Sequence, residues 1–177
     1  FLFNSPRGAC TECSGIGTLY KVNKNKIIPD TSLSIKNGGL APQGVQKDSW
    51  IFKQLEIIAK RYNFNLSSPI SNIPKEALDI ILYGGKDKFS VESKSLGLSR
   101  NYNLDFEGIA NFIESQFKHS DSRSIKRWAK EYMDKIKCPS CQGSRLKKES
   151  LYFKINNKNI SELSEMDIIN LVDWFDK

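Results

Sequence analysis

Two matching cysteine motifs constrain this chain more than any other feature of its sequence. They read Cys10-Thr11-Glu12-Cys13 and Cys138-Pro139-Ser140-Cys141, and in each a glycine follows the second cysteine by two positions. A Cys-x-x-Cys turn brings two sulfurs close enough for one tetrahedral metal, and two such turns complete a four-cysteine site. We therefore expect one structural Zn²⁺, with no open ligand position, bound by Cys10, Cys13, Cys138 and Cys141.

Other uses of this spacing are two redox-active dithiols, two local disulfides, or four buried unreactive cysteines. A redox pair has no reason to occur in two copies that share a glycine, and nothing marks the chain as secreted, so zinc is favoured. Lys137, Lys147 and Lys148 would offset part of the charge of four thiolates. His119, the only histidine, lies in a polar run far from both motifs and is interpreted as a surface residue.

The two motifs are separated by 124 residues, whereas the knuckles of a common zinc ribbon lie about 15–20 residues apart. A whole folded unit is therefore expected between them, pinned at its two ends by the metal. The predicted organisation has four parts: 1–20 as the first half of a zinc module, 21–137 as an insertion domain, 138–150 as the second half of the module, and 151–177 as the truncated start of a host domain. Both chain ends are interpreted as cuts.

The predicted fold class is α+β, a small mixed helix and strand domain on a zinc-knuckle neck with four cysteine ligands. Apolar spacing predicts a helix over about 49–62, with Trp50 on its apolar face and Asp48 as the N-cap. Pro74 is expected to open a second helix that ends at Gly84-Gly85. A weak strand pair is expected within 87–104, and a helix that carries Phe106, Ile109, Ala110, Ile113 and Phe117 follows it.

The clearest predicted helix covers 122–137 and leads into the second cysteine motif, with Trp128, Tyr132 and Ile136 in the core. Beyond that motif we expect a strand over 151–155, a turn at Asn156-Asn157, and a last helix capped by Ser164 with Asp167.

The net charge of +7 is concentrated in one window. Residues 118–148 carry ten basic and three acidic side chains, which suggests a polyanionic partner for this window. A solvated lysine-rich helix face is the alternative. Four cations of the predicted helix are the expected DNA contacts: Arg123, Lys126, Arg127 and Lys130. Such contacts would meet phosphates and not bases.

The sequence resembles the UvrA family, the DNA-damage-binding ATPase subunits of bacterial excinuclease ABC. The family's "FNSP.GAC..C.G.G" stretch is similar to residues 3–17, its "PD..LS" segment to 29–34, and its "FEG" to Phe106-Glu107-Gly108. Residues 138–151 are similar to its "CP.C.G.RL..E.L". The sequence departs from the family at Thr11, where proline is usual, and at 114–117, where the family commonly carries Glu-Arg-Arg-Tyr.

The resemblance implies an insertion into the first ATP-binding half of a longer protein, near its ABC signature domain. It implies a homodimer that binds damaged double-stranded DNA and UvrB in nucleotide excision repair, in the cytoplasm. The family's ATP and Mg²⁺ sites would lie elsewhere, because the sequence has no G-x-x-x-x-G-K-[ST] motif. We therefore expect no ATPase activity and no catalytic residue in this piece.

A protein-binding zinc module of the DnaJ type is the alternative function, because residues 10–17 also fit its cysteine-glycine pattern. Those chaperones carry four such knuckles at short spacing, and two knuckles with a large insert between them argue against it. The sequence shows no run of about 18 apolar residues, so no membrane partner is expected.

Overall fold

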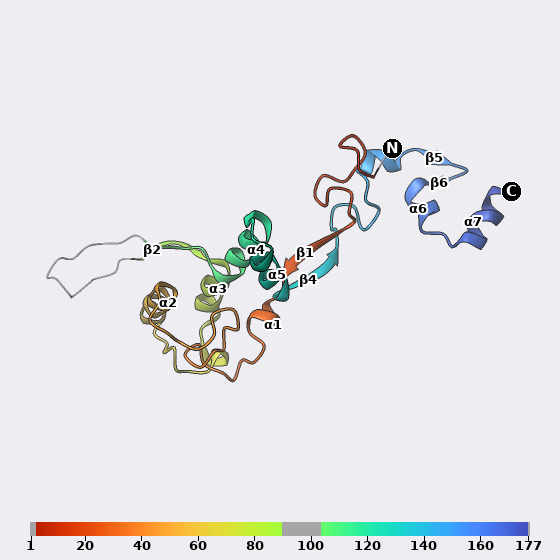
Figure 1. The fold of residues 1–177 in the computed structure, drawn as a ribbon. Helices are drawn as coiled ribbons and strands as arrows, with labels where there is room; N and C mark the ends of the chain where they lie inside the picture. Colours follow the sequence, from red (N-terminus) through yellow and green to blue (C-terminus); the bar gives the residue numbers. More distant parts are fainter. Residues whose placement is uncertain (1–2, 90–103, 177) are drawn as a thin grey trace. The chain divides into compact units, whose positions relative to one another are not determined.

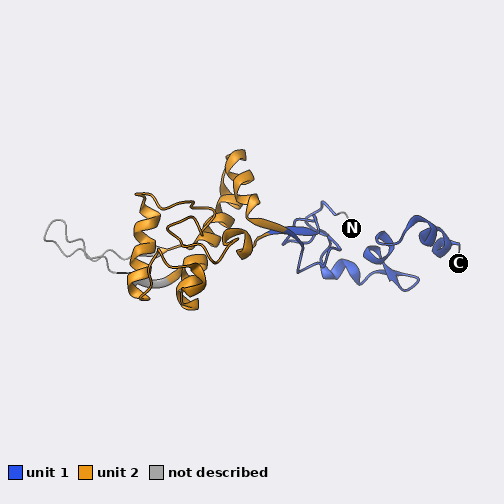
Figure 2. Ribbon diagram, turned by 90° about the horizontal axis from the view of Figure 1, so that it is seen from below, with its two compact units in different colours: residues 1–20, 135–177 blue, residues 21–134 orange. Residues whose placement is uncertain are grey.

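The computed structural model describes residues 3–89 and 104–176. The chain divides into two compact units, coloured separately in Figure 2: unit 1 consists of residues 1–20 and 135–177, and unit 2 of residues 21–134. Unit 1 is therefore assembled from both ends of the chain, whereas unit 2 is continuous. The mixture of helices and short strands confirms the predicted α+β class.

Strands β1 (Thr18–Val22) and β4 (Met133–Lys137) pair in a two-stranded sheet (Figure 1). The chain enters and leaves unit 2 within these two strands. Next to them, Lys26 of the short helix α1 (Lys24–Ile27) forms an ion pair with Asp134 at 2.7 Å, and Asn23 donates a hydrogen bond to the same carboxylate at 2.6 Å. The two ends of unit 2 are thus tied together by contacts of its own.

Besides α1, the described part of unit 2 contains four longer helices: α2 (Trp50–Arg61), α3 (Lys75–Tyr83), α4 (Ile109–His119) and α5 (Arg123–Glu131). Each packs against the next along the chain (Figure 1). The 3-10 turn η1 (Ile70–Asn72) and the long loop before α2 add to the core. The fully buried large side chains of this core are Phe52, Ile27, Ile35, Leu40, Leu55, Ile58, Ile70, Ile81, Leu82, Ile109 and Ile113.

Helix α2 confirms the predicted helix and the burial of Leu55 and Ile58, but Trp50 does not lie on its buried face. The N-cap is Ser49 and not Asp48, and Trp50 is 62% exposed. The buried residues Phe52, Leu55, Ile58 and Ala59 follow the three- and four-residue spacing of one helix face. Trp50 precedes Phe52 by two positions, or about 200° around the helix, and therefore points away from the core.

Two glycines allow α3 and α4 to meet backbone to backbone. Gly84 ends α3 as predicted, with a φ of 81°, and Gly108 precedes α4 with a φ of 87°. A Cβ on Gly108 would lie 2.2 Å from the Gly84 nitrogen, and a Cβ on Gly84 would lie 2.4 Å from the Phe106 carbonyl oxygen. Only glycine fits such a close approach at positive φ.

Beside this contact, strands β2 (Gly85–Phe89) and β3 (Leu104–Phe106) pair antiparallel. They correspond to the predicted strand pair, although residues 90–103 of that prediction lie outside the described residues. Phe106, which was predicted on the following helix, belongs to β3 and is buried.

The predicted helix over 122–137 was wrong in its second half. Helix α5 ends at Glu131, and Met133–Lys137 form strand β4. The segment pairs with β1, and its alternating exposure, with Lys135 and Lys137 outward, is the two-residue period of a strand. Trp128, Tyr132 and Ile136 are half-buried, so their assignment to the core was also wrong.

The C-terminal part of unit 1 consists of short elements: the 3-10 turn η2 (Lys148–Leu151), strands β5 (Lys154–Ile155) and β6 (Lys158–Asn159), and helices α6 (Ile160–Ser164) and α7 (Ile168–Phe175). The turn between β5 and β6 confirms the prediction, because Asn156 and Asn157 have φ values of 44° and 65°. The predicted strand over 151–155 is shorter than expected.

The predicted pairing of Ser164 with Asp167 at the start of one last helix was wrong. Asn159 and Glu162 form a capping box on α6, and Ser164 is the last residue of that helix. Asp167 alone caps α7 by accepting a hydrogen bond from the Asn170 N–H at 2.8 Å. Among the described residues, no helix has the length and apolar character needed to cross a bilayer.

Candidate metal centre and nucleic-acid interface

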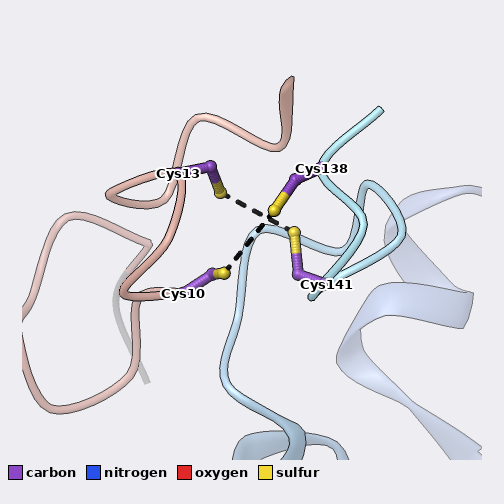
Figure 3. A group of neighbouring side chains, drawn as sticks. All are labelled: Cys10, Cys13, Cys138 and Cys141. Carbon is purple, nitrogen blue, oxygen red and sulfur yellow. Dashed lines mark hydrogen bonds between the residues drawn. The ribbon is translucent and has the colours of Figure 1, made fainter. Parts of the chain in front are cut away.

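The four cysteines come together in unit 1, as Figure 3 shows. Their Sγ atoms all lie within 4.8 Å of one another, and each residue is at most 7% exposed. Cys10 and Cys13 come from the N-terminal segment, Cys138 and Cys141 from the segment after β4. Leu19 packs against the cluster as a partly buried apolar neighbour. The predicted grouping of these residues is therefore confirmed.

Two of the sulfur–sulfur distances match those expected around a tetrahedral metal. Zinc–thiolate bonds of about 2.3 Å place the sulfurs of a tetrahedron about 3.8 Å apart. The Sγ atoms are 3.9 Å apart between Cys10 and Cys138, and 3.7 Å apart between Cys13 and Cys141. A disulfide requires about 2.05 Å. All four cysteines are unbridged, and they form one cluster instead of two separate dithiols.

The two knuckles repeat one backbone conformation. After the second cysteine of each, a residue with φ near 50° (Ser14, Gln142) is followed by a glycine with φ of 77° or 89° (Gly15, Gly143). These left-handed residues fold the chain back on itself. In the first knuckle the chain returns far enough for the Gly17 N–H to donate to Cys13 Sγ at 3.2 Å. Such N–H···S hydrogen bonds stabilise thiolates.

Backbone hydrogen bonds join one knuckle to the other. Ala9 forms an antiparallel bridge with Leu146, and the Cys10 N–H donates to the Arg145 carbonyl at 2.9 Å. The Cys138 N–H donates to the Gly17 carbonyl at 3.0 Å. Two cysteines from distant parts of the sequence are thereby held by the opposite knuckle, which fixes the geometry of the centre.

The thiols of Cys10 and Cys138 differ in how readily they ionise. Burial works against ionisation of Cys10, but hydrogen bonds from the backbone N–H groups of Cys13 and Glu12 outweigh it and lower the pKa of Cys10 to about 7. Burial raises the pKa of Cys138 to about 12. A bound cation would reverse this penalty, because a coordinating thiol is deprotonated by the charge of the metal.

Two residues that lie beside the centre, Arg145 and Glu12, were not predicted from the sequence. Arg145 donates a hydrogen bond from Nε to the Gly15 carbonyl at 2.8 Å, and its guanidinium lies 4.7 Å from the centre of the Phe3 ring. Glu12 places a carboxylate oxygen 3.8 Å from Cys138 Sγ. Arg145 follows the second knuckle directly in the sequence, and this position is a signal that its side chain lies near the centre.

The four predicted DNA-contacting residues all lie on helix α5, and all are exposed. At about 100° per residue, Arg123, Lys126, Arg127 and Lys130 fall within an arc of roughly 100°. We call these four residues the basic face. The apolar side chains of α5, which include Ala129 and Trp128, lie on the opposite side of the helix.

Aromatic contacts fix α5 in unit 2. The Trp128 ring meets Phe112 of α4 edge to face, with centroids 6.3 Å apart, and meets Tyr132 in the same way at 5.6 Å. Ala129 is also fully buried, and this packing directs the basic face to solvent. His119, the last residue of α4, is exposed, which confirms its prediction as a surface residue.

Comparisons with known proteins agree on one family. A family model described as "UvrA DNA-binding domain" matches residues 24–131. The chain is 39% identical over 178 residues to UvrABC system protein A from Listeria innocua, and 37% identical over 179 residues to UvrABC system protein A from Clostridium acetobutylicum. Each alignment covers 99% of this chain and 19% of the relative.

A solved structure shares the fold. The crystal structure of UvrA2 from Deinococcus radiodurans matches with a TM-score of 0.73 and 24% sequence identity, over 99% of this chain and 23% of that one. The chain thus spans about a fifth of the length of the curated relatives it matches. The matched family region, residues 24–131, includes the whole basic face.

Proposed function

Because this chain belongs to the UvrA DNA-binding domain family, we propose that it is the zinc-stapled insertion domain of a UvrA subunit and binds damaged double-stranded DNA in nucleotide excision repair. The observation that carries the proposal is the basic face, four exposed cations on one side of α5 within the matched region. Lysine and arginine on such a face meet phosphates, which supply sequence-independent affinity.

We propose that Zn²⁺ occupies the four-cysteine centre. Four clustered thiolates are a donor set typical of structural zinc, with no ligand position open to a substrate. The metal would supply no chemistry beyond holding the two ends of unit 1 together. Its role is to fix where the insertion leaves its host.

At the level of the whole protein, we propose a homodimer that binds UvrB and carries its ATP and Mg²⁺ sites outside this piece. The segment 151–177 would belong to the host ABC signature domain. Helix α7 supports this assignment, because Ile168, Ile169 and Phe175 are 80%, 75% and 69% exposed. An eight-residue helix with no buried side chain needs a further layer to cover its apolar residues.

The basic face is tested by charge reversal in the full-length protein. Lys126→Glu with Lys130→Glu should weaken binding to a damaged duplex and flatten the dependence of log K on log[salt] by about one unit per lost phosphate contact. Affinity is measured by fluorescence anisotropy across a salt series. Binding to all sequences should weaken alike, because phosphate contacts carry no sequence information.

A matched control uses Lys60→Glu with Lys75→Glu, two exposed lysines on α2 and α3 of the same unit. The control changes the net charge equally but leaves the basic face intact, so it should retain the wild-type salt slope. If both double variants bind with the same affinity and slope as wild type, the cations of α5 only solvate the helix and the proposal fails.

The DnaJ-type alternative is not favoured. The family match and the curated relatives lead to UvrA, and the two knuckles form a single four-cysteine centre with a folded unit between them.

A further inference from the structure

Arg145 occupies a strained position directly against the first knuckle. Its φ is 70°, a left-handed conformation that is unfavourable for a non-glycine residue. Such a residue persists where its surroundings hold it in place. Here four contacts, all within unit 1, hold it.

Two contacts join Arg145 to the loop after Cys13. Its Nε donates to the Gly15 carbonyl at 2.8 Å, and its side-chain stem covers Gly17 so closely that a Cβ there would lie 2.8 Å from Arg145 Cγ. Gly17 is the residue whose N–H donates to Cys13 Sγ. The arginine therefore restrains the peptide that makes the hydrogen bond to this sulfur.

Two further contacts reach the other side of the knuckle. The Arg145 carbonyl accepts the Cys10 N–H at 2.9 Å, and the guanidinium lies over the Phe3 ring at 4.7 Å. Gly15 has no room for a side chain, because a Cβ on this residue would lie 1.8 Å from the Phe3 carbonyl oxygen. One residue of the second half of the module thus contacts Phe3, Cys10, Gly15 and Gly17 of the first half.

We propose that Arg145 is a positioning residue of the metal centre: it fixes the knuckle around Cys10 and Cys13 and, through Gly17, the hydrogen bond to Cys13 Sγ. The inference rests on the proposed zinc centre. The guanidinium of Arg145 also offsets part of the negative charge of four thiolates. Outer-shell partners of this kind typically contribute 10–100-fold to metal affinity.

Arginine differs from lysine at this position for a geometric reason. A planar guanidinium can lie over the Phe3 ring while Nε donates to the Gly15 carbonyl, whereas a lysine ammonium is a point charge without a planar face. Arg145→Lys therefore keeps the charge and loses the positioning. Comparing Arg145→Lys with Arg145→Ala therefore separates the effect of positioning from the effect of charge neutralisation.

The test compares zinc dissociation constants of the whole chain, measured by competition with a chromophoric chelator. Arg145→Ala and Arg145→Lys should both weaken binding about 10–100-fold. Lys148→Ala removes a cation that is exposed like Arg145 but takes no part in the four contacts of Arg145, so its affinity should stay within about threefold of wild type. Hydrogen exchange of the Gly17 amide in the zinc-loaded Arg145→Lys variant should be faster than in wild type.

Wild-type affinity and wild-type Gly17 exchange in both Arg145 variants would overturn the proposal while leaving the zinc centre intact. Loss of affinity in Arg145→Ala with full rescue by Arg145→Lys would also overturn it, because charge alone would then explain the effect. A wild-type chain that binds no zinc would overturn the metal centre itself, which is a separate and distinguishable result.

Discussion

The two units of this chain are stabilised by different means. Unit 2 buries side chains from four helices and the long loop before them, and Phe52, Leu55 and Ile113 are at most 2% exposed. In the described part of unit 1, the buried apolar residues other than the four cysteines are Ala9, Leu146 and Leu163. Burial of apolar surface stabilises unit 2, and unit 1 has too little of it to fold in the same way.

Under the proposed function, this difference would let unit 2 fold as an insertion without depending on its host. A unit with its own core can fold alone, whereas a small unit needs a staple such as a metal. The proposed metal would join two cysteine motifs that are separated by 124 residues in the sequence. The two units should therefore lose their structure independently when each is perturbed.

Metal removal should give the largest effect. Structural zinc contributes on the order of 10 kcal/mol to the folding of its module. Cys138→Ser, or a strong chelator, should therefore disorder the knuckles of unit 1 and leave the helices of unit 2 folded. Elemental analysis gives the zinc content, and hydrogen exchange reports each unit separately. Equal loss of protection in both units would show that unit 2 depends on the metal.

The second prediction is the reverse experiment. Phe52→Ala deletes a fully buried aromatic ring from unit 2 and should cost about 3–5 kcal/mol of its unfolding free energy, with zinc still bound at full stoichiometry. Urea denaturation followed by circular dichroism measures the loss.

Trp50→Ala is its matched control, because it removes a larger ring two residues earlier in the same helix at a 62% exposed position. It should cost less than about 1 kcal/mol, as surface substitutions usually do. A larger loss in Trp50→Ala than in Phe52→Ala would restore the sequence-based prediction that Trp50 faces the core.

The cluster of four cysteines could be predicted because its evidence is local. Two Cys-x-x-Cys turns that share a glycine indicate one site whatever lies between them, and the four cysteines do cluster. Helix ends marked by Pro74 and Gly84 were predictable for the same reason. Arg145 was not, because its four contacts depend on how two distant segments pair.

The errors in the fold arose where tertiary pairing decided between two local patterns. Met133 and Ile136 fit the three-residue spacing of a helix, whereas residues 134–137 show the alternating exposure of a strand, and pairing with β1 selected the strand. Trp50 fitted the helical periodicity equally well, but the buried face of α2 begins at Phe52. Periodicity identifies an amphipathic element more reliably than it fixes the centre of its buried face.

A third prediction concerns how closely unit 2 is packed without help from unit 1. Gly108→Ala places a Cβ at a φ of 87° and 2.2 Å from the Gly84 nitrogen, so the contact between α3 and α4 must open. The expected cost is about 1–3 kcal/mol for the backbone conformation, with the steric overlap adding to it. Gly44→Ala, also at positive φ but with open space around it, isolates the conformational part. Equal costs would show that the close approach contributes nothing.

The smallest expected effect tests whether unit 2 closes its own ends. A hydrogen bond from Lys26, followed by one from Asn23, holds the pKa of Asp134 below its usual value. A carboxyl group whose pKa is lowered by folding stabilises the folded state at pH values above its unfolded pKa, and that contribution is lost as the pH falls through the folded value. Asp134→Asn should therefore lower the Tm of the helical transition slightly at neutral pH, and the difference from wild type should shrink below pH about 4.

Asp48→Asn is the matched control: its ion pair with Lys53 is highly exposed and lies within one segment, so the Tm should stay unchanged at every pH. A Tm difference for Asp134→Asn that persists undiminished at a pH of about 3, below the ordinary carboxyl range, would mean that the side-chain amide itself disturbs the packing, and that the contact with Lys26 does not stabilise the closed end of unit 2.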